Sequence, residues 1–200
     1  MFGLPVATAI NQPLPKKAVF EKFNLKAAER ERFDADISRM VIVHRIDAET
    51  IPAVQCGKEV ESIWVLVVLL KQQNYNPKNI EMLFKLIPQR MILALQFGDE
   101  TQLAAFDGMM VTSSWQKTEE YQLALKGIEL DCVWNNLLAQ VANVVVEEGR
   151  TVREQLEDIA QHEALQKKIA ALEAKARKEH QHHRKIELYN EILKLITNLK

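Results

Sequence analysis

Residues 60–71 read VESIWVLVVLLK, and eight consecutive residues within them, 63-IWVLVVLL-70, are apolar. The run is too short to cross a bilayer as a helix. A loop containing Pro52 and Gly57 precedes it, and Asn74 to Pro77 interrupt the pattern after it. A short apolar run that does not alternate with polar residues is typical of a β-strand covered on both faces. We therefore predict such a strand at residues 60–71.

The flanking sequence predicts the rest of a mixed domain. Short apolar or β-branched runs predict strands at residues 40–46, 90–97, 101–108 and 110–115, with Gly98-Asp99 as the turn of an antiparallel pair. Helical spacing of apolar residues predicts three helices, at residues 18–37, 78–88 and 130–146. Residues 1–17 contain three prolines and are predicted as an extended lead-in. The prediction is an α+β fold, with a small, mostly antiparallel sheet of three to five strands and flanking helices.

The end of the chain has a different composition. No Pro or Gly follows Gly149, and Ala, Glu, Lys, Leu and Gln dominate, which predicts one long helix. Apolar residues there follow alternating four- and three-residue steps, as in a coiled coil, with polar residues in the middle. We predict an α+β body at 1–149 and a helical coiled-coil tail at 150–200. The predicted partner interface of the tail consists of Leu165, Ile169, Leu172, His183, Ile186, Asn190 and Leu193.

His183 and Asn190 are the polar members of this predicted interface. In the register set by the apolar residues, both fall at core positions of the coiled coil. A buried polar side chain in such a core lowers stability but fixes which helices pair and in what alignment. We expect these two residues to have that role.

Composition and charge argue against several function classes. The formal net charge is −1, so no overall field attracts the chain to nucleic acid or to an anionic membrane. Residues 150–200 carry 11 Lys and Arg against 8 Asp and Glu, so the tail is mildly basic. The two cysteines form no CxxC pair and the N-terminus has no signal-peptide pattern. We expect a cytoplasmic protein with both cysteines buried, and no membrane contact.

The segment 175-KARKEHQHHRK-185 is open to three interpretations. His180 and His183 have the three-residue spacing of helical metal ligands, but no cysteine lies nearby, so no metal site and no cofactor is predicted. The basic residues could neutralise phosphates, although interspersed glutamates favour a solvated, salt-bridged helix face. DNA contact is therefore expected to be weak or indirect, through residues Lys175, Arg177, Lys178, Arg184 and Lys185.

A metal-dependent nuclease is the competing hypothesis. A restriction-endonuclease-like core needs a strand with Glu-x-Lys or Asp-x-Lys, because carboxylates bind the metal and the lysine assists the water. Lys71 ends the central strand, but Leu69 stands where the carboxylate is required. The phosphate-loop, dinucleotide, zinc-protease and nucleophile-elbow motifs are also absent from the sequence. A catalytic site is therefore not predicted.

Three segments resemble one bacterial family. They are the start MFGLP…INQPLPKK…F, the centre IPQRMILALQF…TQLAAF and the end LEAKARKEHQHHRKIELYNEILKL, and they resemble domain-of-unknown-function family 4391. The end departs from the family pattern at His182-His183, where members have Phe-Asn. Members tend to be encoded beside superfamily-2 helicases and DNA methyltransferases, which implies a restriction or phage-defence setting. The resemblance assigns no catalytic residue.

Together, the residues and the resemblance predict a non-catalytic accessory subunit. It would bridge a helicase or a DNA methyltransferase, or position them on DNA. Its partner would be one of these proteins or a second copy of itself, bound through the C-terminal helix. An unusual metal-dependent nuclease and a direct DNA-binding module stay open as alternatives.

Overall fold

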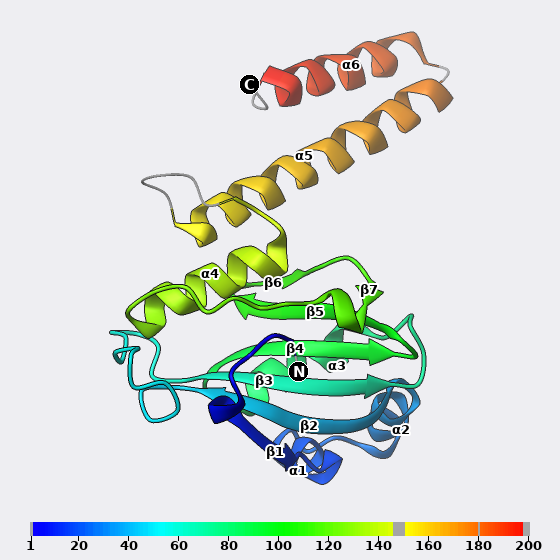
Figure 1. Ribbon diagram of the computed structural model, residues 1–200. Coiled ribbons are helices and arrows are strands. Elements are labelled where there is room, and N and C mark those ends of the chain that lie inside the picture. The colour runs from blue at the N-terminus through cyan, green and yellow to red at the C-terminus, as the bar shows by residue number, and fades with distance from the viewer. Residues whose placement is uncertain (1, 146–150, 180, 198–200) are drawn as a thin grey trace. The chain divides into compact units, whose positions relative to one another are not determined.

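The chain divides into two units, Met1–Val145 and Val146–Lys200, which we call the body and the C-terminal unit. The computed structural model describes residues 2–145, 151–179 and 181–197 (Figure 1). Within the body, strands and helices are intermixed along the chain, as predicted. Among the described residues, no helix is long and apolar enough to cross a membrane.

A seven-stranded sheet forms the body, in the order β1-β2-β3-β4-β5-β6, with β7 paired to β5. This sheet is larger than the predicted one of three to five strands. The N-terminal lead-in accounts for part of the difference, because it pairs with β2 as an edge strand instead of lying free. The strands are β1 (Ala9–Pro13), β2 (Ile37–Ile46), β3 (Ile63–Leu70), β4 (Arg90–Phe97), β5 (Glu100–Asp107), β6 (Met109–Thr112) and β7 (Gln116–Lys117).

The centre of the sheet is a parallel pair, β3 and β4, aligned from Ile63 opposite Arg90 to Leu69 opposite Gln96. Helix α3 (Pro77–Leu86) connects the two strands, as a parallel crossover requires. Antiparallel pairs join β1 to β2, β2 to β3, β4 to β5, and β5 to both β6 and β7. The sheet is therefore mixed, and the prediction of a small, mostly antiparallel sheet did not include the central parallel pair.

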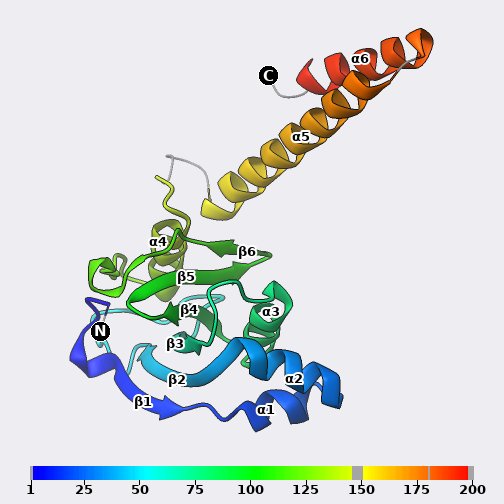
Figure 2. The ribbon, with the colours of Figure 1, turned by 90° about the vertical axis from the view of Figure 1, so that its right-hand side faces the viewer.

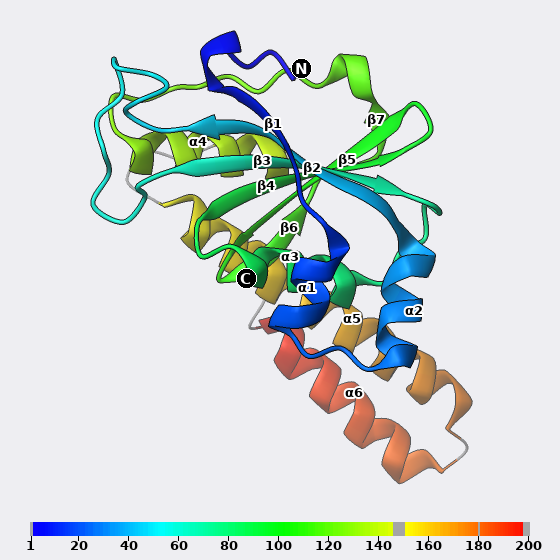
Figure 3. The same ribbon diagram turned by 90° about the horizontal axis from the view of Figure 1, so that it is seen from below.

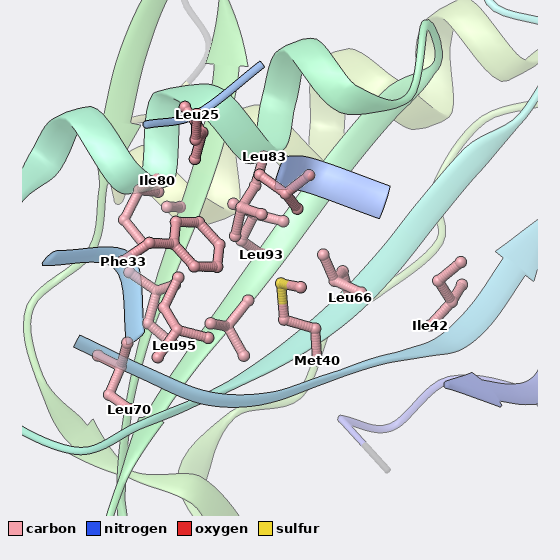
Figure 4. Packing of buried hydrophobic residues seen from close by; sticks show 14 residues of the cluster. Leu25, Phe33, Met40, Ile42, Leu66, Leu70, Ile80, Leu83, Leu93 and Leu95 are labelled. Carbon is pink, nitrogen blue, oxygen red and sulfur yellow. The ribbon is translucent and has the colours of Figure 1, made fainter. Parts of the chain in front are cut away.

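Both faces of the sheet are covered. Helices α1 (Lys16–Lys22), α2 (Ala27–Asp36) and α3 lie on one side, and α4 (Leu130–Ala142) lies on the other (Figures 2 and 3). The side chains of successive residues in β3 point to opposite faces of the sheet. Leu66, Val68 and Leu70 join the first core, together with Phe33 and Leu83 from the helices (Figure 4). The buried residues Ile63, Val65 and Val67 point to the other side, which confirms the predicted strand covered on both faces.

Helix boundaries follow from local chemistry. Helix α3 begins where the Asn76 side chain accepts a hydrogen bond from the Lys78 backbone N–H, with Pro77 at the first helical position. Helix α4 ends at Asn143, whose φ of 54° is left-handed. The single helix predicted at 18–37 is wrong, because the chain turns between α1 and α2 at Asn24, with φ 48°. An asparagine adopts this conformation more readily than most residues.

The C-terminal unit contains two helices rather than one continuous arm. Helix α5 (Val152–Lys178) begins with a capping box between Thr151 and Glu154. It ends where Glu179 takes an extended conformation, and α6 (His182–Thr197) follows. The two helices pack side by side as a hairpin (Figures 1 and 2). The predicted long coiled-coil arm is therefore wrong, since the chain folds back within the segment that we expected to be helical throughout.

Candidate functional site

Helix α6 carries two neighbouring apolar stripes. Leu188, Ile192 and Leu195 are half-buried or buried and recur every three or four residues, so they form the face against α5. Ile186, Tyr189, Leu193 and Ile196 have the same spacing but are 47%, 46%, 61% and 40% exposed. Both stripes together make the apolar face wider than one neighbouring helix can cover. We call the exposed stripe of Ile186, Tyr189, Leu193 and Ile196 the apolar edge.

The predicted interface residues separate into three groups. In α5, the residues Leu165, Ile169 and Leu172 are half-buried. In α6, Ile186 and Leu193 lie on the apolar edge. His183 and Asn190 are exposed on α6. A partner interface at these residues stays a prediction.

The opposite edge of the hairpin is charged. The Lys168 ammonium lies 3.7 Å from the Glu191 carboxylate, which joins α5 to α6 at this edge. Lys175 follows Lys168 by seven residues and Arg184 precedes Glu191 by seven, so both cations lie two turns nearer the hairpin turn on the same edge. The hairpin therefore gathers basic residues that a straight helix would spread along its length.

The five basic residues predicted to contact nucleic acid are not equivalent. Lys175, Lys178 and Arg184 are exposed, and none of these described residues has an ion pair. Arg177 lies 3.6 Å from Glu173, one turn earlier in α5. Lys185 is half-buried on the face against α5. Three of the five side chains are thus available to an anion.

The histidine cluster has no metal-binding geometry in the part that the structure describes. His183 Nδ1 lies 3.3 Å from Glu187 Oε1, and the His183 side chain is 88% exposed. His180 and the side chain of His182 lie outside the described residues. Across the described chain, no group of three or more His, Cys, Asp or Glu residues could hold a metal ion.

The position of the hypothetical nuclease site can also be located. Leu69 is partly exposed at the end of β3, and the Lys71 backbone N–H donates to the carbonyl of Asp36. Asp36 is thus a carboxylate close to Lys71 that sequence reasoning missed, because 35 residues separate them. It is buried and accepts hydrogen bonds from Gln72 Nε2, Asn76 N and Asn79 Nδ2 at 2.6–2.8 Å. These bonds make Asp36 a junction between α2, β3 and α3.

A second buried carboxylate, Asp107, pairs with Arg90. Arg90 lines a cavity of about 270 Å³ together with residues of α3, β4 and β5. Asp107 accepts hydrogen bonds from Arg90 at 2.8 Å and from Trp134 Nε1 at 3.1 Å. The Arg90 guanidinium also lies 5.6 Å from the centre of the Trp134 ring, a favourable cation–π distance. Asp107 neutralises the charge of Arg90, and the Trp134 ring covers it. Since Trp134 belongs to α4 and the other two residues belong to β4 and β5, this cluster joins α4 to the sheet.

The loop before β3 holds the remaining sequence candidate. Cys56 and Cys132 are both exposed, so the prediction that they are buried is wrong. Next to them, the Asp131 carboxylate accepts hydrogen bonds from the backbone N–H groups of Lys58, Glu59 and Val60 at 2.7–3.2 Å. Desolvation raises the pKa of Asp131, but the three N–H groups and the Lys58 charge outweigh it, and the pKa is lowered overall. The carboxylate thereby holds this loop on α4.

Among known proteins, no curated protein and no solved structure matches the chain. The model of one family, described as Domain of unknown function (DUF4391), matches residues 2–199. This match spans both the body and the C-terminal unit, so it includes the hairpin with its two edges. The chain therefore belongs to the DUF4391 family, as the three resembling segments indicated.

Proposed function

We propose that the protein is a non-catalytic accessory subunit that binds a protein partner through the apolar edge of its C-terminal hairpin. The observation that supports this is the exposure of Ile186, Tyr189, Leu193 and Ile196 on one side of α6. Exposed apolar side chains scattered singly are ordinary on a protein surface, whereas a contiguous row is typical of an interaction site. Tyrosine and isoleucine anchors are suited to such a site, since they lose little rotamer freedom on binding.

The geometry of a two-helix hairpin supports the same proposal. Two helices can bury only the faces that they turn toward each other, and helix bundles ordinarily need a further helix or two to enclose an apolar core. A helix from a partner, laid along the apolar edge, would contact residues three or four positions apart on α6. This is the helix-in-groove mode of recognition.

The family suggests the kind of partner. The resemblance to DUF4391 implies a setting beside superfamily-2 helicases and DNA methyltransferases, so we propose one of these proteins as the partner. The subunit would bridge the two, or position one of them on DNA, in a restriction or phage-defence system. A second copy of the chain is the other occupant that the test must distinguish.

The test is co-purification of the full chain with the two proposed partners, a superfamily-2 helicase and a DNA methyltransferase. The mass of each complex is measured by light scattering after size-exclusion chromatography. A variant carrying Ile186→Gln and Ile196→Gln should bind its partner at least tenfold more weakly, because interface anchors commonly contribute 1–4 kcal/mol each. The matched control carries Glu187→Gln and Lys194→Gln in the same helix, outside the apolar edge, and should bind like the wild type.

Two results would contradict the proposal. One is a wild-type chain that elutes as a monomer and binds neither candidate partner. The other is a double variant at the apolar edge that binds as strongly as its control while circular dichroism shows both to be folded. A wild-type dimer that the apolar-edge variant reduces to a monomer would identify the second copy as the occupant.

A further inference from the structure

The register of the hairpin places two cations at corresponding positions of α5 and α6, one heptad from an ion pair. Lys168 and Glu191 are oppositely charged and lie 3.7 Å apart. One heptad nearer the turn, the corresponding positions carry Lys175 on α5 and Arg184 on α6. Like charges that share one edge repel each other, so this arrangement lowers the stability of the hairpin unless an anion lies between them.

Lys178 extends the same arrangement. It follows Lys175 by three residues, which places it on the next turn of α5 on the same side. All three side chains are exposed, and among the described residues none of the three has an ion pair. The one acidic residue of the turn, Glu179, accepts a hydrogen bond from the Gln181 backbone N–H at 2.9 Å. We call Lys175, Lys178 and Arg184 the basic edge.

We infer that the basic edge binds the phosphate backbone of double-stranded nucleic acid. Three exposed cations within two turns of one helix and the start of the next provide a local positive charge, although the whole chain has a net charge of −1. Phosphate contacts need only cationic side chains at the surface of a rigid element. The helical hairpin is such an element.

The neighbours of the basic edge favour nucleic acid over an acidic protein. Ala171 and Ala174 are the small exposed residues beside Lys175, so this edge has no large apolar side chain to anchor a peptide. Among the described residues, this edge also has no phenylalanine, tyrosine or tryptophan ring on which an unpaired base could stack, because Tyr189 belongs to the apolar edge. The contact is therefore with phosphates of a duplex, without base readout and without sequence preference.

The position of this edge gives it a role distinct from partner binding. The apolar edge lies on the other side of α6 from Glu191, which marks the charged side. A partner helix and a duplex could then occupy the hairpin at the same time. The inference does not depend on the proposed function, because duplex binding by the isolated chain can be measured without any partner.

The experiment is fluorescence anisotropy of a labelled 30-base-pair duplex titrated with the full chain between 50 and 200 mM salt. We expect a Kd in the range of about 10⁻⁴ to 10⁻⁶ M at physiological salt, which is ordinary for non-specific binding. The variant with Lys175→Gln, Lys178→Gln and Arg184→Gln should bind at least tenfold more weakly. Its slope of log K against log salt should be smaller by up to about 2.7, since each phosphate contact contributes about 0.9.

The matched control removes the same charge from the body. Lys78, Lys117 and Lys126 are exposed, and their triple substitution by Gln should change the Kd by less than twofold. The variant with Ile186→Gln and Ile196→Gln should also bind the duplex like the wild type, whatever happens to partner binding. Competitors are poly-glutamate and unlabelled duplexes of different sequence.

Several outcomes would overturn the inference. Absence of binding at 50 mM salt, or equal weakening by the basic-edge variant and the body control, would show that the three cations form no phosphate site. If poly-glutamate displaced the labelled duplex as effectively as an unlabelled duplex of equal charge does, the basic edge would be a site for an acidic protein. A preference of tenfold or more for one duplex sequence would contradict the absence of base readout.

Discussion

Asp131 shows how a single residue organises a distant loop. Its carboxylate accepts three backbone N–H groups from residues 58–60, more than 70 positions earlier in the sequence. Gly57 permits this approach, because a Cβ on it would lie 2.2 Å from Asp131 Oδ1 and 2.9 Å from the Asp131 backbone nitrogen. A sequence pattern offers no signal for such a contact, because periodicity reports on neighbours in one element. The helix at 130–146 and the strand at 60–71 were therefore predictable, but the contact of Asp131 with the loop before that strand was not.

Replacing Asp131 by Asn should lower the free energy of unfolding by about 1–2 kcal/mol at pH 7, since hydrogen bonds to a charged acceptor are lost. The lowered pKa of Asp131 sets the pH dependence. Its contribution is fully present above the unfolded pKa of about 3.9 and is lost as the pH falls through the lower folded value. Urea unfolding should thus show a gap between wild type and variant that is constant from pH 7 to 5 and narrows below about pH 4. A gap that persists undiminished at acidic pH would rule out this ionic origin.

The nuclease hypothesis can also be tested at single residues, namely Leu69 and Lys71. The nearby Asp36 already accepts three hydrogen bonds, so metal binding there would have to break the α2–α3 junction. We expect the purified chain to cleave neither plasmid nor single-stranded DNA in the presence of Mg²⁺ or Mn²⁺. The Lys71→Ala variant serves as the comparison, because cleavage by the wild type that this variant abolishes would establish a nuclease.

Strand β3 was predicted from its composition, whereas the division of the C-terminal helical segment into α5 and α6 was not predicted. An apolar run specifies burial on both faces, and the residues of 63–70 other than Leu69 are indeed buried or half-buried, with helices on both sides of the sheet. The C-terminal segment has helical composition throughout, so local propensity favours continuation past Glu179. The break results instead from packing of α6 against α5, a tertiary effect that overrides propensity. The polar interruption at His182–Lys185 coincides with the start of α6 and is the sequence feature that could have indicated it.

Ile192 and Ile186 provide a matched pair within α6, because they are the same residue type on the two apolar stripes. Ile192 is 5% exposed and Ile186 is 47% exposed. Ile192→Ala should destabilise the hairpin by about 2–4 kcal/mol through lost burial and a cavity, whereas Ile186→Ala should cost about 1 kcal/mol or less. Amide hydrogen exchange in α5 and α6 measures the difference. Equal protection in both variants would mean that Ile192 does not belong to the face between the helices.

At the scale of the whole molecule, the body contains its own core. Helices α1–α3 cover one face of the sheet and α4 covers the other, and all of these elements precede Asn143. The mixed α and β class was predictable from alternating strand and helix patterns. The number of strands was not, since β1 is exposed along its length and β7 has two residues. Short or exposed edge strands carry little hydrophobic signal, so their pairing depends on the neighbouring strand.

Removal of residues 150–200 should therefore leave a folded body. The fragment 1–149 retains every strand and both helical layers, so hydrophobic burial on both faces of the sheet is conserved. We expect a single cooperative transition in urea, with a free energy of unfolding in the ordinary range of about 5–15 kcal/mol. Circular dichroism and tryptophan fluorescence should report the same midpoint, because Trp64 packs on one side of the sheet and Trp134 is buried in α4. A fragment that binds hydrophobic dyes and unfolds without cooperativity would instead show that the C-terminal unit completes the core, and the hairpin could not then be a separate interaction module.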